Sequence, residues 1–508
     1  MNKIISILVG ALVWAAASAV ASAERQSIAV LGWALPDLSG SAPQRAAGDD
    51  PVVGRQICPA LTRLNLSLKK SEELLLKRVS HEHPSSGDAV VFHYELRPGL
   101  FWWSGQAVTG AELAGFLRAQ LPLLAAERSD GLWTVPKFEV RTDGPLGASI
   151  HFQQEPPFGP FIVNGAPFFR SVDGGQKSSF AFECVGLYRP TLKPFGLLLL
   201  PVESYKSTKE LPQVAIYQAA ERPAKLPPQY LELRYASAIT STPEQRPSDR
   251  GSGCNRTLEL PQVAMIVWNT QNGLMANPGL RRALSALIPR AALVAAGTAQ
   301  LAEVTSSLVP HEHPGYHHQT STHGFDLHAA SAALNRLGYL RKTSGSPRLD
   351  SAGAPLTLTF VASGPLPNLA EKVLADTFAA VGIRLEFRVS SKQDADSQLF
   401  DGTLALFDID WPRLNLLGNF HRGRKVYGPF NAPSDAELDQ LLERYAASLT
   451  TLLPDFTSLM QVQKRLAELE PVTVLFRQKA CLESGPAVRL PAGSLNLRDP
   501  DWFRRLLL

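Results

Sequence analysis

The chain has 508 residues, of which 45% are hydrophobic and 19% are charged, and its formal net charge is +4. This composition supplies apolar residues for a large core and more than one domain, and it excludes long charged disordered tails. So small a charge over this length is not the clustered basic surface of nucleic-acid binding, and we expect no nucleic-acid partner.

The first 23 residues have the pattern of an export signal. Lys3 gives a positive start, an apolar run follows from residue 4 to residue 20, and Ala21-Ser22-Ala23 has the small residues of a cleavage site. The run is short for a membrane span and has no basic flank, which favours cleavage over anchoring. No cysteine follows the cleavage site, so we expect no lipid anchor. The sequence therefore predicts a periplasmic protein with a signal peptide at 1–23.

The cysteines lie far apart and include no C-x-x-C pair, which argues against a metal cluster. In an oxidising compartment they are compatible with one or two disulfides, and all three full pairings stay open. The four positions are Cys58, Cys184, Cys254 and Cys481.

Short strands and turns dominate the first part of the chain. We expect a strand at 26–33, a helical segment at 52–61 and a strand at 88–96, where apolar residues alternate. After the Arg97-Pro98-Gly99 turn, Thr109 is placed to cap a helix that runs to about residue 117.

Helix signals become clearer after residue 270. Asn277 followed by Pro278 predicts a helix start, and Pro289 must end or kink that helix. Asp326 can cap the next helix. A strand at 356–360, a helix at 369–380 and a strand at 383–389 then predict a parallel β-α-β unit. The last expected elements are helices at 436–447 and 454–469 and a strand at 472–476 that crosses back to the first part of the chain.

Five motifs in a fixed order resemble the family 5 extracellular solute-binding proteins, the peptide and nickel binders of ABC importers. The first is the strand-turn-helix string FHYELRPG (92–99) with WSG (103–105) and VT (108–109). The others are EPPF (155–158), the strand AMIVWNT (264–270), the helix at 277–294 and the helix at 325–339. Together they span nearly the whole mature chain.

The resemblance implies an α/β, two-lobed periplasmic-binding-protein fold with an extra small subdomain and a hinge between the lobes. Lobe one would comprise residues 24–52, 160–258 and 471–508, and the small subdomain residues 53–159. Lobe two would comprise residues 259–470, and two chain crossings near 258 and 470 would form the hinge. Ligand would be trapped when the lobes close.

The strand-like run before Asp408, Asp410 and Trp411 is the main candidate for a ligand site. If the strand continued, alternation would point both carboxylates to one face, beside a large aromatic ring that could stack on a cationic group. By resemblance, Asp410 aligns with the acid that receives the ligand α-ammonium in peptide-binding members. Asp408 is the alternate acid, and Arg413 could clamp a carboxylate. The competing roles are a cap or hinge salt bridge for the acids, core packing for Trp411 and a solvated loop for Arg413.

Two further candidates come from the family motifs. Trp103 could face the cleft, although adjacent Trp102 and Trp103 point to opposite sides and core packing suits either residue. Asn269 ends an apolar strand and could contact a ligand backbone, or it could cap the turn toward Gly273.

A histidine-rich tract is the sharpest oddity of composition, and its weak metal-ligand candidates are His311, His313, His317 and His318. Pro310, Pro314 and Gly315 in the same stretch favour a surface loop instead. The sequence contains no G-x-S-x-G, H-E-x-x-H or G-x-x-x-x-G-K motif, so we expect no enzyme and no cofactor.

We therefore expect a monomeric periplasmic binding subunit that captures a peptide or another small polar solute and presents it to the membrane permease of an ABC importer. The alternatives are a sensory or regulatory protein of the same fold that no longer feeds a transporter, and a metal-binding member that uses the histidine tract.

Overall fold

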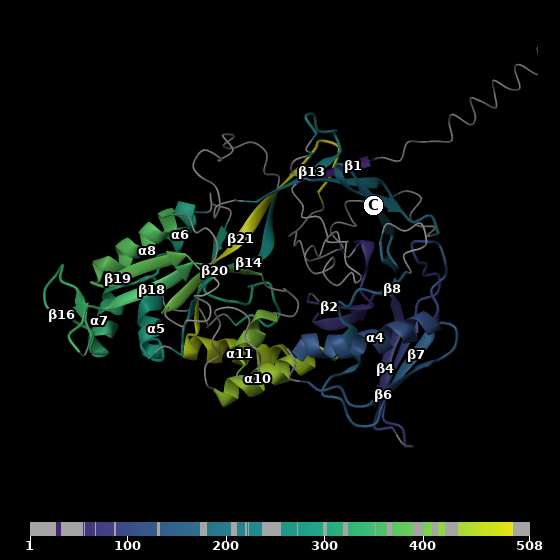
Figure 1. Ribbon diagram of the computed structural model, residues 1–508, viewed down its shortest axis with the longest axis horizontal. Helices are drawn as coiled ribbons and strands as arrows, with labels where there is room; N and C mark the ends of the chain where they lie inside the picture. The colour runs from purple at the N-terminus through teal and green to yellow at the C-terminus, as the bar shows by residue number, and fades with distance from the viewer. Residues whose placement is uncertain are drawn as a thin grey trace, which may run out of the picture.

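The computed structural model has two lobes joined by long strands (Figure 1). Among its described residues, no helix is long and apolar enough to cross a membrane. The structure describes residues 27–31, 54, 56–66, 68–85, 88–129, 133–172, 180–204, 211–218, 221, 223–235, 256–271, 273–297, 302–317, 324–350, 352–362, 368–389, 400–408, 415–421 and 435–490.

An 11-stranded sheet runs through both lobes in the order β10-β11-β12-β1-β13-β21-β14-β20-β18-β19, with β15 added beside β21. Its first-lobe strands are β1 (Ser27–Leu31), β10 (Tyr188–Lys193), β11 (Gly196–Pro201), β12 (Gln213–Tyr217) and β13 (Tyr230–Tyr235). Its second-lobe strands are β15 (Ala302–Val304), β18 (Thr357–Ala362), β19 (Arg384–Val389) and β20 (Gly402–Asp408). The two strands that pass between the lobes are β14 (Arg256–Trp268) and β21 (Val472–Ser484), which we call the crossing strands.

The crossing strands pair antiparallel from Arg256 opposite Leu482 to Val267 opposite Val472. The register shifts between Glu259 and Val263. These two residues are four positions apart on β14, but their partners Lys479 and Arg477 are only two positions apart on β21. Pro261 lies in this bulge, where a residue without a backbone N–H costs no ladder bond. The expected strand at 472–476 is thus part of a longer strand that does cross back to the first lobe.

The first lobe carries a separate four-stranded antiparallel sheet in the order β4-β5-β7-β6. Its bounds are β4 (Leu76–Glu82), β5 (Val90–Leu96), β6 (Phe138–Thr142) and β7 (Gly147–Phe152). Around it lie β2 (Thr62–Asn65), β3 (Lys70–Glu73), β8 (Phe169–Ser171), β9 (Phe182–Cys184), the 3-10 turn η1 (Pro160–Val163) and α4 (Gly110–Ser129).

Helix α4 begins where the sequence predicted and ends later. Thr109 and Glu112 form a reciprocal capping box, in which the Thr109 N–H donates to Glu112 and the Glu112 N–H donates to the Thr109 hydroxyl. The helix continues past residue 117 to Ser129 although it contains Pro122. Leu121 and Leu124 extend its buried face into the first-lobe core, and this packing outweighs the local cost of proline.

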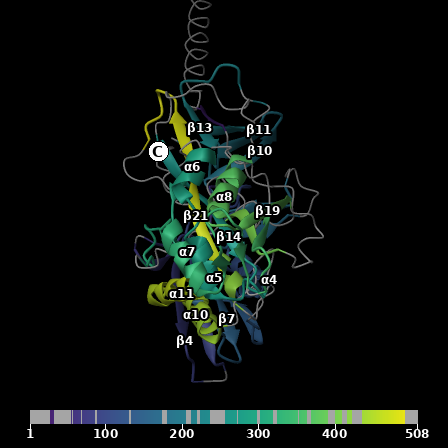
Figure 2. The same cartoon turned by 90° about the vertical axis from the view of Figure 1, so that its left-hand side faces the viewer.

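Helices cover both faces of the second-lobe sheet. One core contains α5 (Pro278–Ser285), α6 (Arg290–Gly297), α7 (Leu327–Arg336) and α8 (Asn368–Ala380). The other contains α10 (Ala436–Ser448), α11 (Phe456–Leu469) and η6 (Asn415–Phe420). Small antiparallel strands β16 (Leu340–Arg341) and β17 (Arg348–Leu349) complete the lobe. Figure 2 looks onto this lobe.

The predicted helix signals of this lobe are confirmed. Asn277 caps α5 by accepting from the N–H groups of Gly279 and Leu280, and α5 has ended before Pro289. Asp326 caps α7 through the Ala329 N–H. Strands β18 and β19 are parallel on either side of α8, as the β-α-β pattern required.

Cys58 and Cys184 form a disulfide, with their Cα atoms 5.1 Å apart. Cys481 is also disulfide-bonded, and the described residues include no free cysteine. The Cys58–Cys184 bond ties the start of the small sheet region to β9.

Candidate functional site

The parallel strands of the two lobes point their carboxyl ends at each other. In the first lobe, β1 is parallel to β12 and β13, and β13 runs along β21 toward the second lobe. In the second lobe, β20 is antiparallel to β14 and runs back toward the first lobe, with β18 and β19 parallel to it. Ligands in open α/β sheets bind outside the carboxyl ends of the strands, so the candidate site lies between these two sets of ends.

Asp408, the first acid of the predicted ligand site, lies at this edge of the second lobe. Asp408 is the last residue of β20 and is paired with Gln262, next to the bulge in β14. Asp410, Trp411 and Arg413 follow directly but lie outside the described residues. Their ligand role therefore stays a prediction. The strand that they follow, β20, has its carboxyl end between the lobes.

Asn269 lies at the opposite end of the same strand pair. The register that pairs Gln262 with Asp408 also pairs Trp268 with Gly402, six residues away. At roughly 3.4 Å per residue, about 20 Å separates these ends, so the structure does not bring Asn269 and Asp408 together. Asn269 is fully buried, and its side-chain amide donates to the Phe400 carbonyl at 3.0 Å.

Trp103 lies in the first-lobe core beside Phe180 and Phe182, with ring centroids 6.2 and 5.8 Å away. The side chain is 5% exposed, and its indole N–H has no hydrogen-bond partner among the described residues. Its ligand role stays a prediction.

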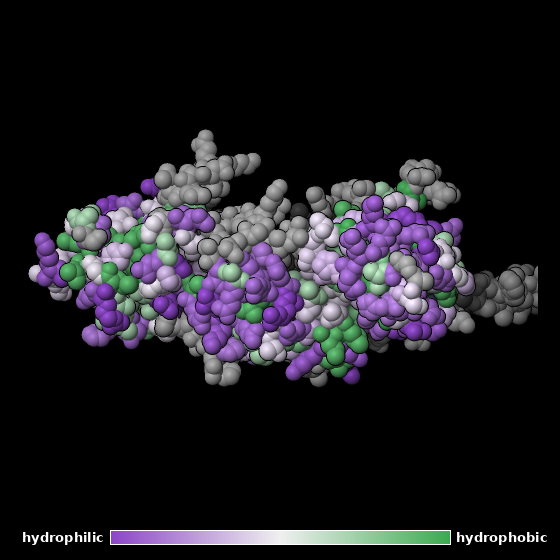
Figure 3. All heavy atoms as spheres, turned by 90° about the horizontal axis from the view of Figure 1, so that it is seen from below, coloured by the Kyte–Doolittle hydropathy of each residue, from purple (hydrophilic) through white to green (hydrophobic). Residues whose placement is uncertain are grey.

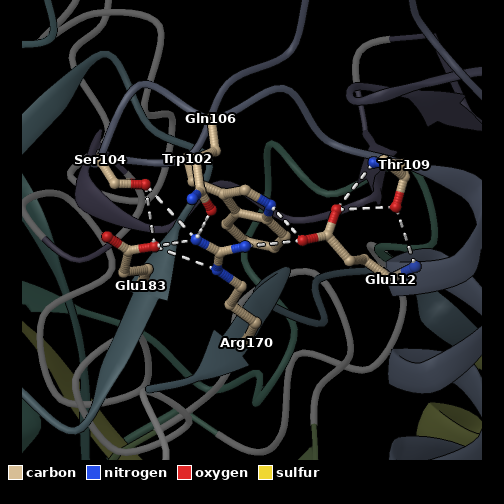
Figure 4. A network of polar contacts seen from close by, with 7 residues as sticks. All are labelled: Trp102, Ser104, Gln106, Thr109, Glu112, Arg170 and Glu183. Carbon is tan, nitrogen blue, oxygen red and sulfur yellow. Dashed lines mark hydrogen bonds and ion pairs between the residues drawn. The ribbon is translucent and has the colours of Figure 1, made fainter. Parts of the chain in front are cut away.

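The neighbouring motif residues form a polar network around Arg170 (Figure 4). The guanidinium lies 4.9 Å from the Trp102 ring centroid and donates to Glu112 at 2.7 Å and Glu183 at 2.6 Å. The Trp102 indole N–H also donates to Glu112. A charge-paired cation over a buried indole fastens β8 and β9 to the start of α4. Ser104 of the WSG string and Thr109 of the VT string, which we identified as family motifs, therefore have a structural role here. Sequence reasoning missed their charged partners Arg170, Glu112 and Glu183.

Charged groups gather where the crossing strands meet β15. Arg477 is buried and donates to the carbonyls of Ser307 and Leu308, and burial lowers its pKa to about 10. Burial, followed by the nearby carboxylates of Glu312 and Glu303, raises the pKa of Glu259. Lys479 pairs with Glu303 at 2.6 Å. The lobe junction thus holds an ionic cluster that the sequence did not indicate, because its members are spread over more than 200 positions.

The histidine tract is only partly described, since His318 lies outside the described residues. His311 is exposed and pairs with Glu312 at 2.6 Å, whereas His313 is buried against Phe456. Among the described residues, no group of three or more His, Cys, Asp or Glu side chains could hold a metal ion.

Ser149, His151 and Asp88 form a hydrogen-bond relay on the small sheet. The His151 ring lies 2.9 Å from both the Ser149 hydroxyl and an Asp88 carboxylate oxygen. A nucleophilic serine must be reachable, but Ser149 is 1% exposed and sits in the middle of a strand paired on both sides. The relay is therefore a partly buried polar connection between β7 and the residues just before β5.

Comparison with known proteins agrees with this geometry. Residues 235–415 match the model of the bacterial extracellular solute-binding proteins, family 5 middle region. The resemblance to family 5 solute-binding proteins is confirmed. No curated protein matches this chain in sequence.

Solved structures share the two-lobed fold over nearly the whole chain. The ABC transporter substrate-binding protein from Sinorhizobium meliloti has a TM-score of 0.68 at 16% identity, covering 93% of this chain and 98% of that one. NikA from Brucella suis, in complex with Fe(III)-EDTA, has a TM-score of 0.67 at 15% identity, covering 92% and 97%. The putative peptide-binding protein AppA from Clostridium difficile also has a TM-score of 0.67 at 15% identity, covering 92% and 96%.

Proposed function

We propose that the protein is the periplasmic solute-binding subunit of an ABC importer, and that it captures a peptide or another small polar solute between its lobes. The observation that carries this proposal is the opposed orientation of the parallel strands, whose carboxyl ends meet between the lobes. The crossing strands would then be the hinge, and closure would enclose the solute.

Within this site we propose Asp410 as the acceptor for a cationic group of the solute. It follows the end of β20 by two residues, and a carboxylate withdrawn from water there would favour a bound ammonium group. Trp411 and Arg413 would flank it, Asp408 is the alternate acid, and Asn269 and Trp103 are more remote candidates. The lobe limits near residues 258 and 470 are part of the same proposal.

The solutes named for similar structures are chemically diverse, so a broad screen is the first test. We expect a single class of peptide, or a small metal complex, to raise the Tm of the mature protein by linkage between binding and stability. Peptides of two to nine residues, Ni(II) with histidine and Ni(II) alone should be compared. A response to Ni(II) alone that His311→Ala removes would favour the metal-binding alternative, and no response to any solute would contradict capture.

A sensory protein and a transport protein of this fold would differ in the protein that the ligand-loaded form binds. We expect the ligand-loaded protein to bind the detergent-solubilised permease encoded beside it more tightly than the empty protein does. Equal binding of both forms, or the lack of a neighbouring permease gene, would favour the sensory alternative.

A further inference from the structure

The lobes meet a second time, far from the crossing strands. The chain between α10 and α11, residues 449–452, contacts the first lobe at Ser71, Gly159, Phe161 and Asn164, and we call this set the closure contact. In Figure 1 the crossing strands run from the upper part of the molecule to its middle, whereas α10, α11 and α4 lie below them.

Hydrogen bonds at the closure contact satisfy the backbone just past the end of α10. The Gly159 N–H donates to the Thr450 hydroxyl at 2.7 Å, and the Phe161 N–H donates to the Thr450 carbonyl at 2.8 Å. Asn164 donates through its side-chain amide to the Leu449 carbonyl at 3.1 Å. Carbonyls at a helix end have no partner within the helix, so the first lobe supplies the donors that they need.

Ser71 provides the other half of the contact. Its N–H donates to the Leu452 carbonyl and its hydroxyl to the Thr451 carbonyl, both at 2.8 Å. The Asn164 amide also donates to this hydroxyl, which fixes its orientation. Ser71 is 1% exposed and Thr450 is fully buried, so these bonds are shielded from water in this structure.

Gly159 makes the approach sterically possible. A Cβ atom at this position would lie 2.6 Å from the Thr450 carbonyl oxygen, a distance that real Cβ atoms do not reach. Leu64 and Leu66 of the first lobe pack against the apolar core around α10 and α11 in the same region. On the face seen from below, hydrophilic residues gather over α10 and α11, and a hydrophobic patch lies beside them (Figure 3).

We propose that the closure contact is a latch that holds the lobes together around the solute and thereby sets the affinity for it. This inference rests on the proposed function, because only a protein that opens at its crossing strands needs such a latch. Rotation about one end of the lobe interface separates the other end most, so opening must break these hydrogen bonds. The apparent Kd is the intrinsic Kd divided by the closed fraction, so a weakened latch weakens binding without touching the ligand site.

The test measures lobe separation without any solute, which keeps it independent of the ligand question. Spin labels at Leu123→Cys in α4 and Lys372→Cys in α8, both exposed positions, report the distance between the lobes. We expect the parent protein to populate the distance of the present structure, and Gly159→Ala to lower that population at least fivefold in favour of longer distances. Thr450→Val, which keeps the side-chain volume but removes the hydroxyl, should lower it about threefold.

Matched controls separate the latch from general damage. Gly115→Ala adds a methyl group to α4 where nothing lies within 4 Å, and Thr377→Val removes a hydroxyl that bonds only within α8. Neither should change the distance distribution, and circular dichroism should show all four variants folded. If the distance distributions of Gly159→Ala and Thr450→Val match those of the controls, the latch proposal is wrong. The proposal of solute capture would not be affected by that result. Loss of solute binding with an intact latch would contradict the proposed function instead.

Discussion

At the crossing strands the lobes share a long antiparallel ladder and an ionic cluster around buried Arg477. At the closure contact they share a few hydrogen bonds and two half-buried leucines. The first region is chain-continuous and cannot separate without unfolding. The second joins segments that lie about 290 to 380 positions apart and can exchange each bond for water. Stability and opening should therefore respond to different substitutions, and the following predictions test that division in order of expected effect.

We expect the largest loss of stability at Arg281, which contacts the residues just before β21. Arg281 is buried and donates to the carbonyls of Met275, Leu469 and Glu470, which fastens α5 to the turn before β21. Arg281→Met would leave these carbonyls unsatisfied, and we expect the free energy of unfolding to fall by about 3 kcal/mol. Denaturation with urea measures it. Arg282→Met, one residue away and exposed, is the control and should change it by less than about 0.5 kcal/mol.

Glu470 makes the same region sensitive to pH. Burial raises the pKa of its carboxyl from 4.5 to about 7, against the opposing effect of hydrogen bonds from Ser285 and Thr473 and of the Arg290 and Arg281 charges. Because the folded state raises this pKa, the stability it contributes is complete below about pH 4.5 and is lost as the pH rises through about 7.

Glu470→Gln removes this titration. Between pH 5 and pH 8 the free energy of unfolding of the parent should therefore fall by about 2 kcal/mol more than that of Glu470→Gln. Urea denaturation at several pH values measures this difference. Glu468→Gln, an exposed neighbour paired with Arg465, should follow the parent curve. Parallel curves for Glu470→Gln and the parent would show that Glu470 titrates normally.

Thr450→Val should change the opening of the lobes more than it changes the stability of the fold. It removes one buried hydroxyl that accepts from Gly159 and donates to the Ala447 carbonyl, so we expect the free energy of unfolding to fall by only about 1 kcal/mol. The same substitution should nevertheless raise the dissociation rate of a bound solute about threefold, measured by stopped-flow fluorescence. An unfolding change as large as that of Arg281→Met would mean that the closure contact is a permanent part of the fold.

The smallest effect is expected at the partly exposed pair of Lys479 and Glu303. Pairs of this kind contribute little, so Lys479→Met should cost about 0.5 kcal/mol. The cost should shrink in high salt, because mobile ions screen exposed charges. A larger cost that persists in high salt would mean that this pair is shielded from solvent, as Arg477 is.

The helices of the second lobe could be predicted because their signals are local. Asn277 and Asp326 each cap the first turn of the helix that follows them, and Pro289 lies between the end of α5 at Ser285 and the start of α6 at Arg290. The length of α4 could not be predicted, because Pro122 argues locally for an end that tertiary packing of Leu121 and Leu124 overrides.

The candidate site was only partly accessible from sequence. The run up to Asp408 was correctly read as a strand, and its direction toward the first lobe follows from pairing that only the fold reveals. Asn269 and Asp408 looked like members of one site because both end apolar strands, but their strands are antiparallel and these ends lie apart. Arg170, Arg477 and Thr450 gave no sequence signal, since each acts on partners brought in by the fold.

Calorimetry on Asp410→Ala tests the central claim most directly. The solute that raises the Tm most in the screen should bind the parent protein with one site per chain. We expect Asp410→Ala to weaken that binding at least tenfold with an unchanged Tm of the empty protein, and Asp376→Ala on exposed α8 to leave it unchanged. Equal affinities for the parent and Asp410→Ala would contradict the assignment of the ligand site to the end of β20.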